Sequence, residues 1–345
     1  VDFLYEESPE PAPLPLETFP LAHHAAGIGK VYARSDWTDA ATWFRFECGD
    51  LWNGHQHYET GNFEIFRYEP LATESGEYAD YTSSHAVNWL IRTVAHNCIL
   101  VNQPDEKWNR QRDGGRNTYA NDGGQDRRAE WFAPDLPTWL KQRDQWKRGK
   151  IVAYENRPEF LFVAGDCTKA YAPSKLGLCM RQIVFLRPGT FVIFDRVIST
   201  KAEYEKTWLL HSRFEPKFDG LSATIENGKG KLIVRTLLPE AAKIDKIEGY
   251  TYGGQTFNEV KNAQSDTANR WRIEVKPPAP RTEDVFLHVL FTEQPQETKL
   301  MREGESIGVQ VGPATVMFTG RVGGELRPNG QKVPLQAKVV RGKYE

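Results

Sequence analysis

The sequence has few cysteines, no long apolar run and almost no net charge, and each shortage excludes a class of protein. Its four cysteines show neither C-x-x-C spacing nor the density of a disulfide scaffold, so most are expected to be buried thiols. No stretch approaches the roughly 20 consecutive apolar residues of a transmembrane helix. A formal net charge of −2 gives no general attraction to polyanions. We therefore expect neither a nucleic-acid partner nor a membrane partner.

Long helical patterns are also scarce, and short strand-like runs take their place. From residue 27 onward, apolar and polar side chains alternate in segments rich in aromatic residues and separated by turn signals. With 345 residues, 39% of them apolar, the chain can bury a large core, which excludes a disordered protein. No repeat of about 20–50 residues indicates a propeller or solenoid. The sequence predicts an all-β fold of large, stacked antiparallel sheets.

Composition divides the chain into three parts. Residues 1–25 hold five prolines and several acids, which is typical of an extended linker, and we expect it to lead from an earlier segment that is missing. Residues 26–262 carry most of the strand patterns, including a meander through 151–213 and a hairpin around Asn227-Gly228. Residues 263–345 are expected to form a smaller C-terminal β region.

Histidines and carboxylates are concentrated in one stretch of the chain. In the run GHQHYETG, His55, His57 and Glu59 alternate, so on a strand all three would face the same way. Glu74 occupies a turn, and His96 is expected where RTVAHNCILV enters another strand. Imidazoles from two strands and one carboxylate would make a suitable ligand set for Zn²⁺. The alternative is a group of hydrogen-bonded loop histidines and a turn acid, and the H-x-H spacing alone does not decide between them.

The segment from residue 103 to residue 128 has little periodicity and carries six basic and five acidic residues. Long irregular loops in compact domains are more often functional than idle. Arginine binds carboxylate or sulfate through two parallel hydrogen bonds, and tryptophan can stack on a sugar ring. The candidates for ligand contacts in this loop are Trp108, Arg110, Arg112 and Arg116. The alternative is a charge-balanced loop exposed to solvent.

Several of these runs together resemble a known family. GHQHYETGNFEIF, LATESGEYADYTSSH and RTVAHNCILV are similar to the H-x-H-x-D-x-G-x-F, D-S-G and A-H-N motifs of the heparinase II/III-like polysaccharide lyases. RQIVFLRPGTFVIFDRV also resembles the central β-sheet of that family, and the similarity spans about residues 20–260. The resemblance implies a β-supersandwich, preceded in the family by an α/α-toroid domain that we expect to be absent from this chain.

The resemblance also implies roles for individual residues. The zinc ligands of the family correspond to His57, Glu74 and His96. The histidine that neutralises the substrate's charge corresponds to His55, and the tyrosine general acid/base corresponds to Tyr81 or, alternatively, Tyr78.

Glutamates replace aspartates at two positions of the family pattern. Glu74 is longer than aspartate by one methylene, which would loosen or change the metal site. Glu59, like Asn97 beside His96, is expected to orient an imidazole rather than bind the metal. Cys98 is expected to be a small buried thiol rather than a ligand.

The chemistry implied by the resemblance is β-elimination across a uronate. That reaction needs the carboxylate charge damped, a base for the C5 proton and an acid for the departing glycosidic oxygen. Tyrosine, with an ordinary pKa near 10, needs a neighbouring cation or metal to act as the base. We therefore expect a zinc-containing lyase of an acidic polysaccharide, secreted or periplasmic because its polymer substrate lies outside the cytoplasm. The alternatives are a uronate C5-epimerase and a non-catalytic carbohydrate-binding β-sandwich with structural zinc.

Overall fold

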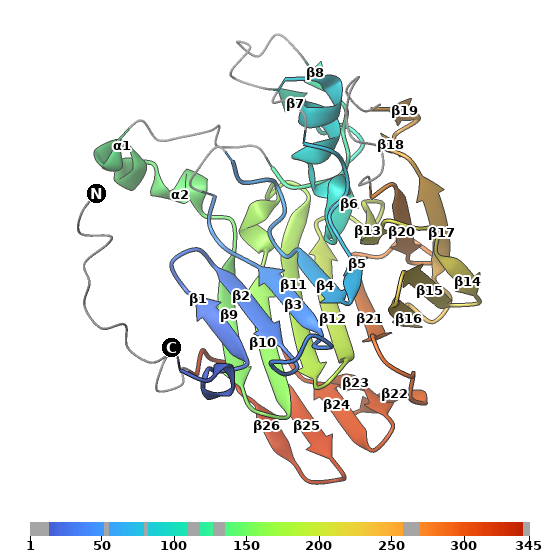
Figure 1. The fold of residues 1–345 in the computed structure, drawn as a ribbon. Coiled ribbons are helices and arrows are strands. Elements are labelled where there is room, and N and C mark those ends of the chain that lie inside the picture. Colours follow the sequence, from blue (N-terminus) through green and yellow to red (C-terminus); the bar gives the residue numbers. More distant parts are fainter. Residues whose placement is uncertain are drawn as a thin grey trace.

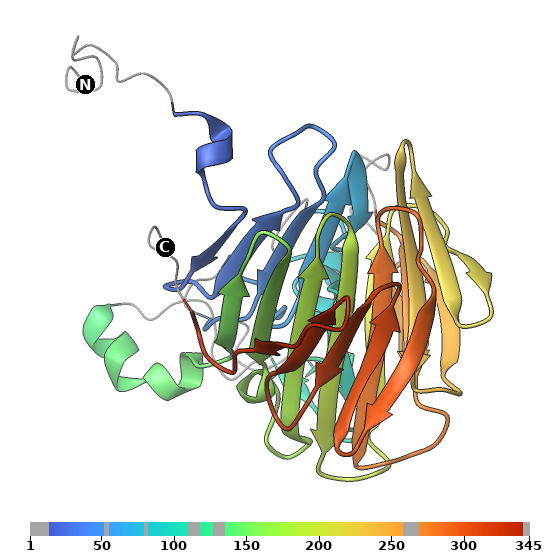
Figure 2. The ribbon, with the colours of Figure 1, turned by 90° about the horizontal axis from the view of Figure 1, so that it is seen from below.

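The computed structural model describes residues 14–51, 55–78, 82–109, 118–126, 135–257 and 269–340. Within these ranges, nearly all regular structure is antiparallel strand arranged in several sheets, which confirms the all-β prediction. The larger sheets are stacked in layers, as Figure 1 and the view from below in Figure 2 show.

The central layer is an eight-stranded sheet with the order β14-β15-β16-β21-β12-β11-β10-β9. Its strands are β9 (Lys150–Asn156), β10 (Phe160–Asp166), β11 (Leu176–Leu186), β12 (Thr190–Ser199), β14 (Lys217–Asp219), β15 (Ser222–Asn227), β16 (Gly230–Leu238) and β21 (Glu283–Phe291). The near-continuous apolar runs of β11 and β12 are buried on both faces, as expected for strands that other sheets cover on each side.

The predicted meander is present from β9 to β12, and the hairpin at Asn227-Gly228 joins β15 to β16. The prediction is wrong for residues 204–213, which form β13 (Glu205–Ser212) in a different sheet. The reason is that β21 already pairs with the edge of β12 that β13 would need.

One face of the central sheet is covered by a five-stranded sheet in which consecutive strands pair. Its strands are β1 (Ala22–Ala25), β2 (Lys30–Arg34), β3 (Trp43–Glu47), β4 (Phe63–Arg67) and β5 (Glu69–Ala72). Phe44 of β3 packs between the two layers, with its ring centroid 5.3 Å from that of Phe191 on β12. Alternation along β3 buries Phe44 and Phe46 and leaves Arg45 between them partly exposed on the other face of the sheet.

The opposite face of the central sheet is covered by the C-terminal strands. These are β22 (Thr298–Glu303), β23 (Ser306–Val311), β24 (Ala314–Phe318), β25 (Gly324–Pro328) and β26 (Val333–Leu335). Phe318 of β24 stacks on Phe194 of β12, with ring centroids 4.6 Å apart. The central sheet therefore contributes to two apolar cores, one on each face.

The fourth of the larger sheets has four strands in the order β17-β20-β13-β6. Its strands are β17 (Lys243–Glu248), β20 (Trp271–Lys276), β13 and β6 (Ile99–Asn102). Strands β20 and β21 follow residue 263 in the chain but belong to the four-stranded and central sheets. The strands of residues 263–345 are thus shared among three sheets.

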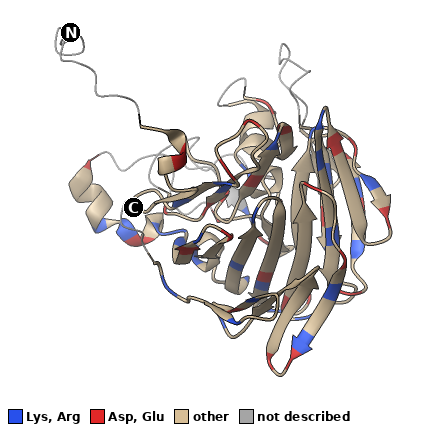
Figure 3. Cartoon of the chain, turned by 60° about the horizontal axis from the view of Figure 1, so that its bottom comes forward, with Lys and Arg blue, Asp and Glu red and all other residues tan. Residues whose placement is uncertain are grey.

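Helices are short and lie in the connections. They are α1 (Leu136–Lys141), α2 (Arg143–Trp146), the 3-10 turns η2 (Leu16–Thr18), η4 (Thr93–Ala95) and η6 (Thr168–Ala170), and the π-helical turn η3 (Ala86–Leu90). The two-residue strands are β7 (Trp108–Asn109), β8 (Thr118–Tyr119), β18 (Thr251–Tyr252) and β19 (Gln255–Thr256). In the described ranges, every helix is too short or too polar to cross a membrane. Acidic and basic residues are interspersed along the chain (Figure 3).

Candidate metal centre

Three connections meet beside the β1–β5 sheet: the loop before β4, the turn after β5 and the 3-10 turn η4 before β6. His55, His57 and Glu59 lie in the loop and not on the predicted strand, because β4 begins only at Phe63. The loop folds back on itself through the Asn62 amide, which donates to the Glu59 carbonyl at 2.8 Å. Gly61 makes this turn possible with a left-handed φ of 96°.

His96 lies at the entrance to a strand, as expected, but it is not part of that strand. The backbone of His96 is extended, but it only caps the end of η4, and β6 begins three residues later at Ile99. The backbone bonds explain this: the His96 amide donates to the Thr93 carbonyl and the Cys98 amide to the His96 carbonyl, so both amides are used in turns, although the Cys98 carbonyl accepts from Leu209 of β13.

The three predicted metal ligands converge at this meeting point. His57, Glu74 and His96 each offer one ligand atom, and these atoms lie within 4.8 Å of one another. Among the described residues, neither Nδ1 of His57 nor either ring nitrogen of His96 has a hydrogen-bond partner at normal geometry, and the backbone of Leu90 is the polar group nearest to bonding the His96 ring. A buried polar atom left without a partner costs about 1–3 kcal/mol, so a bound cation that accepts one lone pair from each ring would stabilise this arrangement.

Burial keeps both imidazoles neutral. It lowers the pKa of fully buried His96 to about 3, and it also lowers the pKa of His57. The negative charge of Glu59 opposes both shifts but does not overcome the burial. A neutral imidazole offers a lone pair to a cation, and two imidazoles with one carboxylate suit Zn²⁺. The donor set therefore fits the metal implied by the sequence motifs.

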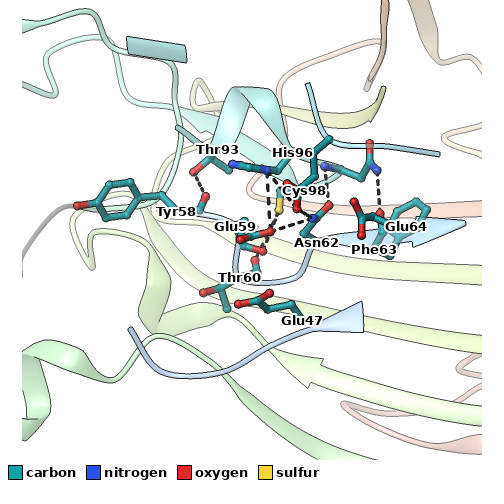
Figure 4. A network of polar contacts seen from close by, with 12 residues as sticks. Glu47, Tyr58, Glu59, Thr60, Asn62, Phe63, Glu64, Thr93, His96 and Cys98 are labelled. Atoms are coloured by element: carbon teal, nitrogen blue, oxygen red, sulfur yellow. Dashed lines mark hydrogen bonds and ion pairs between the residues drawn. The ribbon is translucent and has the colours of Figure 1, made fainter. Parts of the chain in front are cut away.

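Two residues that sequence reasoning missed hold the carboxylates. Arg45 reaches the site from β3 and forms ion pairs with Glu59 at 3.3 Å, with Glu64 at 2.7 Å and, at closer range, with Glu74. The Asn62 side-chain amide donates to Glu59 Oε2 at 3.0 Å and to Glu74 Oε1 at 2.9 Å. Part of this network is drawn in Figure 4. In the sequence, Arg45 could have been noticed as a charged residue between the two phenylalanines of WFRFE.

Glu59 lies close to His96 but does not form a hydrogen bond with it. Its Oε2 is 4.0 Å from Nδ1 of His96, and Oε1 of Glu74 is 3.9 Å from the same nitrogen. These distances are too long for hydrogen bonds. Both carboxylates therefore face the imidazole across a gap.

Asn97 joins the segments that carry the ligands. Its backbone amide donates to Asn62 Oδ1 at 3.0 Å, and its side-chain amide donates to the carbonyls of Phe63 at 2.7 Å and Thr73 at 3.0 Å. Its Oδ1 accepts from the His211 amide at 2.7 Å. Its contacts are thus with Asn62, His211 and the backbones beside the ligands, and not with the candidate ligand imidazoles.

A buried ion pair of the central sheet is hydrogen-bonded to the loops of the candidate metal centre. Arg181 of β11 forms two hydrogen bonds to Asp195, its register partner on β12, at 2.7 and 3.0 Å. The same guanidinium donates to the carbonyls of Gly61, at 2.6 Å, and Asn97. Arg181 therefore binds both loops that carry the histidines. Opposite charges within apolar strands were the sequence signal for this pair.

Of the other predicted site residues, the structure describes three and four lie outside the described ranges. His55 is exposed, yet it is near enough to His57 to contribute to the lowering of that residue's pKa. Tyr78 is 60% exposed. Trp108 begins β7, which pairs with β8. Tyr81, Arg110, Arg112 and Arg116 lie outside the described residues.

Comparison with known proteins places this geometry in a family. The model of the C-terminal domain of the heparinase II/III-like proteins matches residues 22–272. That range includes every residue of the candidate metal centre described above. No curated protein matches the chain in sequence.

Solved structures share the fold. The heparan sulfate lyase HepC from Pedobacter heparinus has a TM-score of 0.59 and 14% sequence identity, over 93% of this chain and 43% of that protein. A heparinase III gene product has a TM-score of 0.60 and 13% identity, over 94% of this chain and 42% of its own. The chain thus spans less than half the length of these proteins. By its match over residues 22–272, the chain belongs to the heparinase II/III-like family, in the C-terminal domain of that family.

Proposed function

We propose that this chain forms part of a polysaccharide lyase that cleaves an acidic, uronate-containing polysaccharide by β-elimination. The observation that carries the proposal is the convergence of His57, Glu74 and His96 beside the exposed His55, in a chain of the heparinase II/III-like family. The names of HepC and the heparinase III proteins connect similar folds with heparan sulfate and heparin. This supports an acidic polysaccharide as the substrate class.

The reaction removes the proton from C5 of the uronate, forms the C4–C5 double bond and breaks the bond between C4 and the glycosidic oxygen. His55, exposed at the edge of the site, is assigned to the substrate carboxylate, whose charge it would damp so that the C5 proton becomes more acidic. A tyrosine, Tyr81 or Tyr78, is assigned to transfer the proton to the leaving oxygen. A bound Zn²⁺ would add positive charge near the carboxylate and hold the three ligand segments together.

The test is the absorbance of the unsaturated uronate product. The protein encoded by the gene is incubated with heparan sulfate, alginate and related uronate polymers, and the ultraviolet absorbance is followed. We expect a rise with at least one polymer and its loss in His55→Ala. The matched control is His23→Ala, because His23 is an exposed histidine on β1. No rise with any of these polymers would overturn the proposal.

Two further outcomes identify the alternatives. A product with inverted C5 and no unsaturation would indicate an epimerase, which returns the proton instead of expelling the leaving group. Binding of polymer without any chemical change, together with tightly held zinc, would indicate a carbohydrate-binding domain with a structural metal.

A further inference from the structure

A basic pocket lies beside the candidate metal centre. It has a volume of about 900 Å³ and is formed by the connection after β1, the end of β3, the segment after α2 and the ends of β9 and β10. Five basic residues line it: Arg143, Lys147, Arg148, Lys150 and Lys169. Two acidic residues, Asp50 and Asp166, also line it. In Figure 3, α2 and the segment that follows it include several blue positions.

The acidic groups of the pocket are already bound by other parts of the chain. Asp166 accepts hydrogen bonds from the Arg321 guanidinium at 2.6 Å and from the Thr168 amide at 3.0 Å. Asp50 accepts from the Arg148 backbone amide at 3.1 Å. Five basic minus two acidic residues leaves a charge of +3 on the lining, which falls to +2 when Asp144, the partner of Lys147 at 2.5 Å, is included, in a chain whose net charge is −2. A local excess of this kind concentrates anions at one place on the surface.

The pocket and the metal centre share a wall. Gly49, Asp50 and Arg148 line the pocket, and the same three residues line a narrow crevice that reaches His57. The crevice has a volume of about 10 Å³, which is close to the space needed by one water molecule. Arg148 is 2% exposed and forms part of both cavities. An anion in the pocket would thus lie one layer of residues away from a metal ligand.

We propose that this pocket is a subsite for anionic sugar residues of the polysaccharide chain, separate from the residues that carry out the elimination. This inference rests on the proposed function for the identity of the ligand. Lysine and arginine bind carboxylate and sulfate groups through charge-assisted hydrogen bonds, and the rest of the lining is largely aliphatic or glycine. The volume is in the range of small-molecule sites.

The lining favours a sugar over a nucleic acid. Single-stranded nucleic acids are usually bound through aromatic rings on which the bases stack. Among the described residues that line the pocket, there is no tryptophan, tyrosine or phenylalanine. The contacts that remain are cationic and aliphatic, which suits an acidic saccharide.

The experiment compares two variants with the same change in charge. Lys150→Glu/Lys169→Glu alters the pocket, whereas Lys231→Glu/Lys299→Glu alters exposed lysines on β16 and β22. Binding of a heparin-derived tetrasaccharide is measured by calorimetry at low and high salt. We expect the pocket variant to bind at least about tenfold more weakly, with a smaller salt dependence, and the control to bind within about twofold of the wild type.

A second probe separates the two kinds of anion. An alginate-derived tetrasaccharide carries carboxylates without sulfates, and charge-dependent binding of either probe supports the subsite. Equal affinity of the pocket variant and the control for both probes would overturn it, and so would a wild-type protein that binds neither. If the double variant does not fold, Lys150→Gln and Lys169→Gln remove the charges singly and allow the same comparison.

The result is distinguishable from failure of the proposed function. Unsaturated product is assayed separately, so tetrasaccharide binding that depends on Lys150 and Lys169 without any product would retain the subsite and reject the lyase. Product formation, together with a tetrasaccharide affinity that is unchanged when Lys150 and Lys169 are replaced, would retain the lyase and reject the subsite.

Discussion

At the scale of single residues, the glutamate at position 74 is the main departure from the family's motif. Its side chain is longer than aspartate, but Oε1 accepts hydrogen bonds from both Arg45 and Asn62. Two donors restrict the extra rotamers that the added methylene provides. The longer side chain is therefore held in place by Arg45 and Asn62, and a loosened site does not follow from its length alone.

His96 provides the sharpest test of the metal centre. Purified protein should contain about one zinc per chain, and His96→Ala should lose it, because His96 is the fully buried member of the candidate ligand set. Zinc at about 100 times its Kd should stabilise the chelator-treated wild type by about 2.7 kcal/mol and leave the variant unchanged. Elemental analysis and thermal melting measure the two effects.

The control for this prediction is His23→Ala, which removes an exposed histidine away from the three ligands. It should retain the zinc and its stabilising effect. Stoichiometric zinc in His96→Ala, or a wild-type melting temperature that does not respond to zinc, would contradict the assignment of the ligands.

At the scale of secondary structure elements, strand identity was predictable where burial alone determines it. The runs around residues 183 and 193 are apolar at almost every position, and they form the doubly covered strands β11 and β12. Alternation misled at His55, His57 and Glu59, because a period of two also fits a loop whose amides are used in turns. The motif still located the three residues that converge.

The supporting residues could not be predicted, because their roles depend on contacts distant in sequence. Arg181 contacts Gly61 across 120 positions, and Arg45 contacts Glu74 across 29. The Arg181 contact forms only when the β1–β5 sheet packs on the central sheet, and the Arg45 contact forms only when β3, β4 and β5 have assembled. A single sequence records the charged residues but not which of them meet.

Arg181 and Asp195 should behave as a coupled pair. Arg181→Met leaves a buried carboxylate and two carbonyls without their donor, so we expect a loss of about 3–5 kcal/mol of unfolding free energy. Arg181→Met/Asp195→Leu should lose less than the sum of the two single variants. Both Arg181 variants should bind zinc more weakly, since the two histidine loops lose their shared anchor. Denaturant unfolding and zinc titration measure these effects.

A surface pair on neighbouring strands gives the matched control. Arg196 of β12 pairs with Glu283 of β21 at 2.6 Å, with side chains 32% and 43% exposed. Arg196→Met should cost less than about 1 kcal/mol and leave zinc affinity unchanged. Equal costs for the two arginine substitutions, or unchanged zinc affinity in Arg181→Met, would reject the role of Arg181 as an anchor.

At the scale of the whole molecule, the stacking of sheets buries groups that ionise in water. His288 of β21 is fully buried, and its ring stacks on Trp208 of β13 at 3.9 Å, where the central and four-stranded sheets meet. Burial, with a smaller contribution from Arg181, lowers the pKa of His288 to about 3. The layered core is therefore compatible with the neutral imidazole only.

This burial makes the stability of the molecule depend on pH. Below pH 6.5 the unfolded chain protonates His288, whereas the folded chain does not until the pH approaches 3. The unfolded state then binds more protons, so the free energy of unfolding falls as the pH falls. Between pH 7.5 and pH 5, one such histidine should cost about 2 kcal/mol.

His288→Phe should remove this contribution while keeping a ring against Trp208. Its unfolding free energy, measured by denaturant titration at several pH values, should decline less steeply than that of the wild type between pH 7.5 and pH 5. His23→Phe, which alters an exposed position, should keep the wild-type slope. The pH window lies above the range in which ordinary carboxylates titrate. Identical slopes in His288→Phe and the wild type would mean that sheet packing does not keep this imidazole neutral.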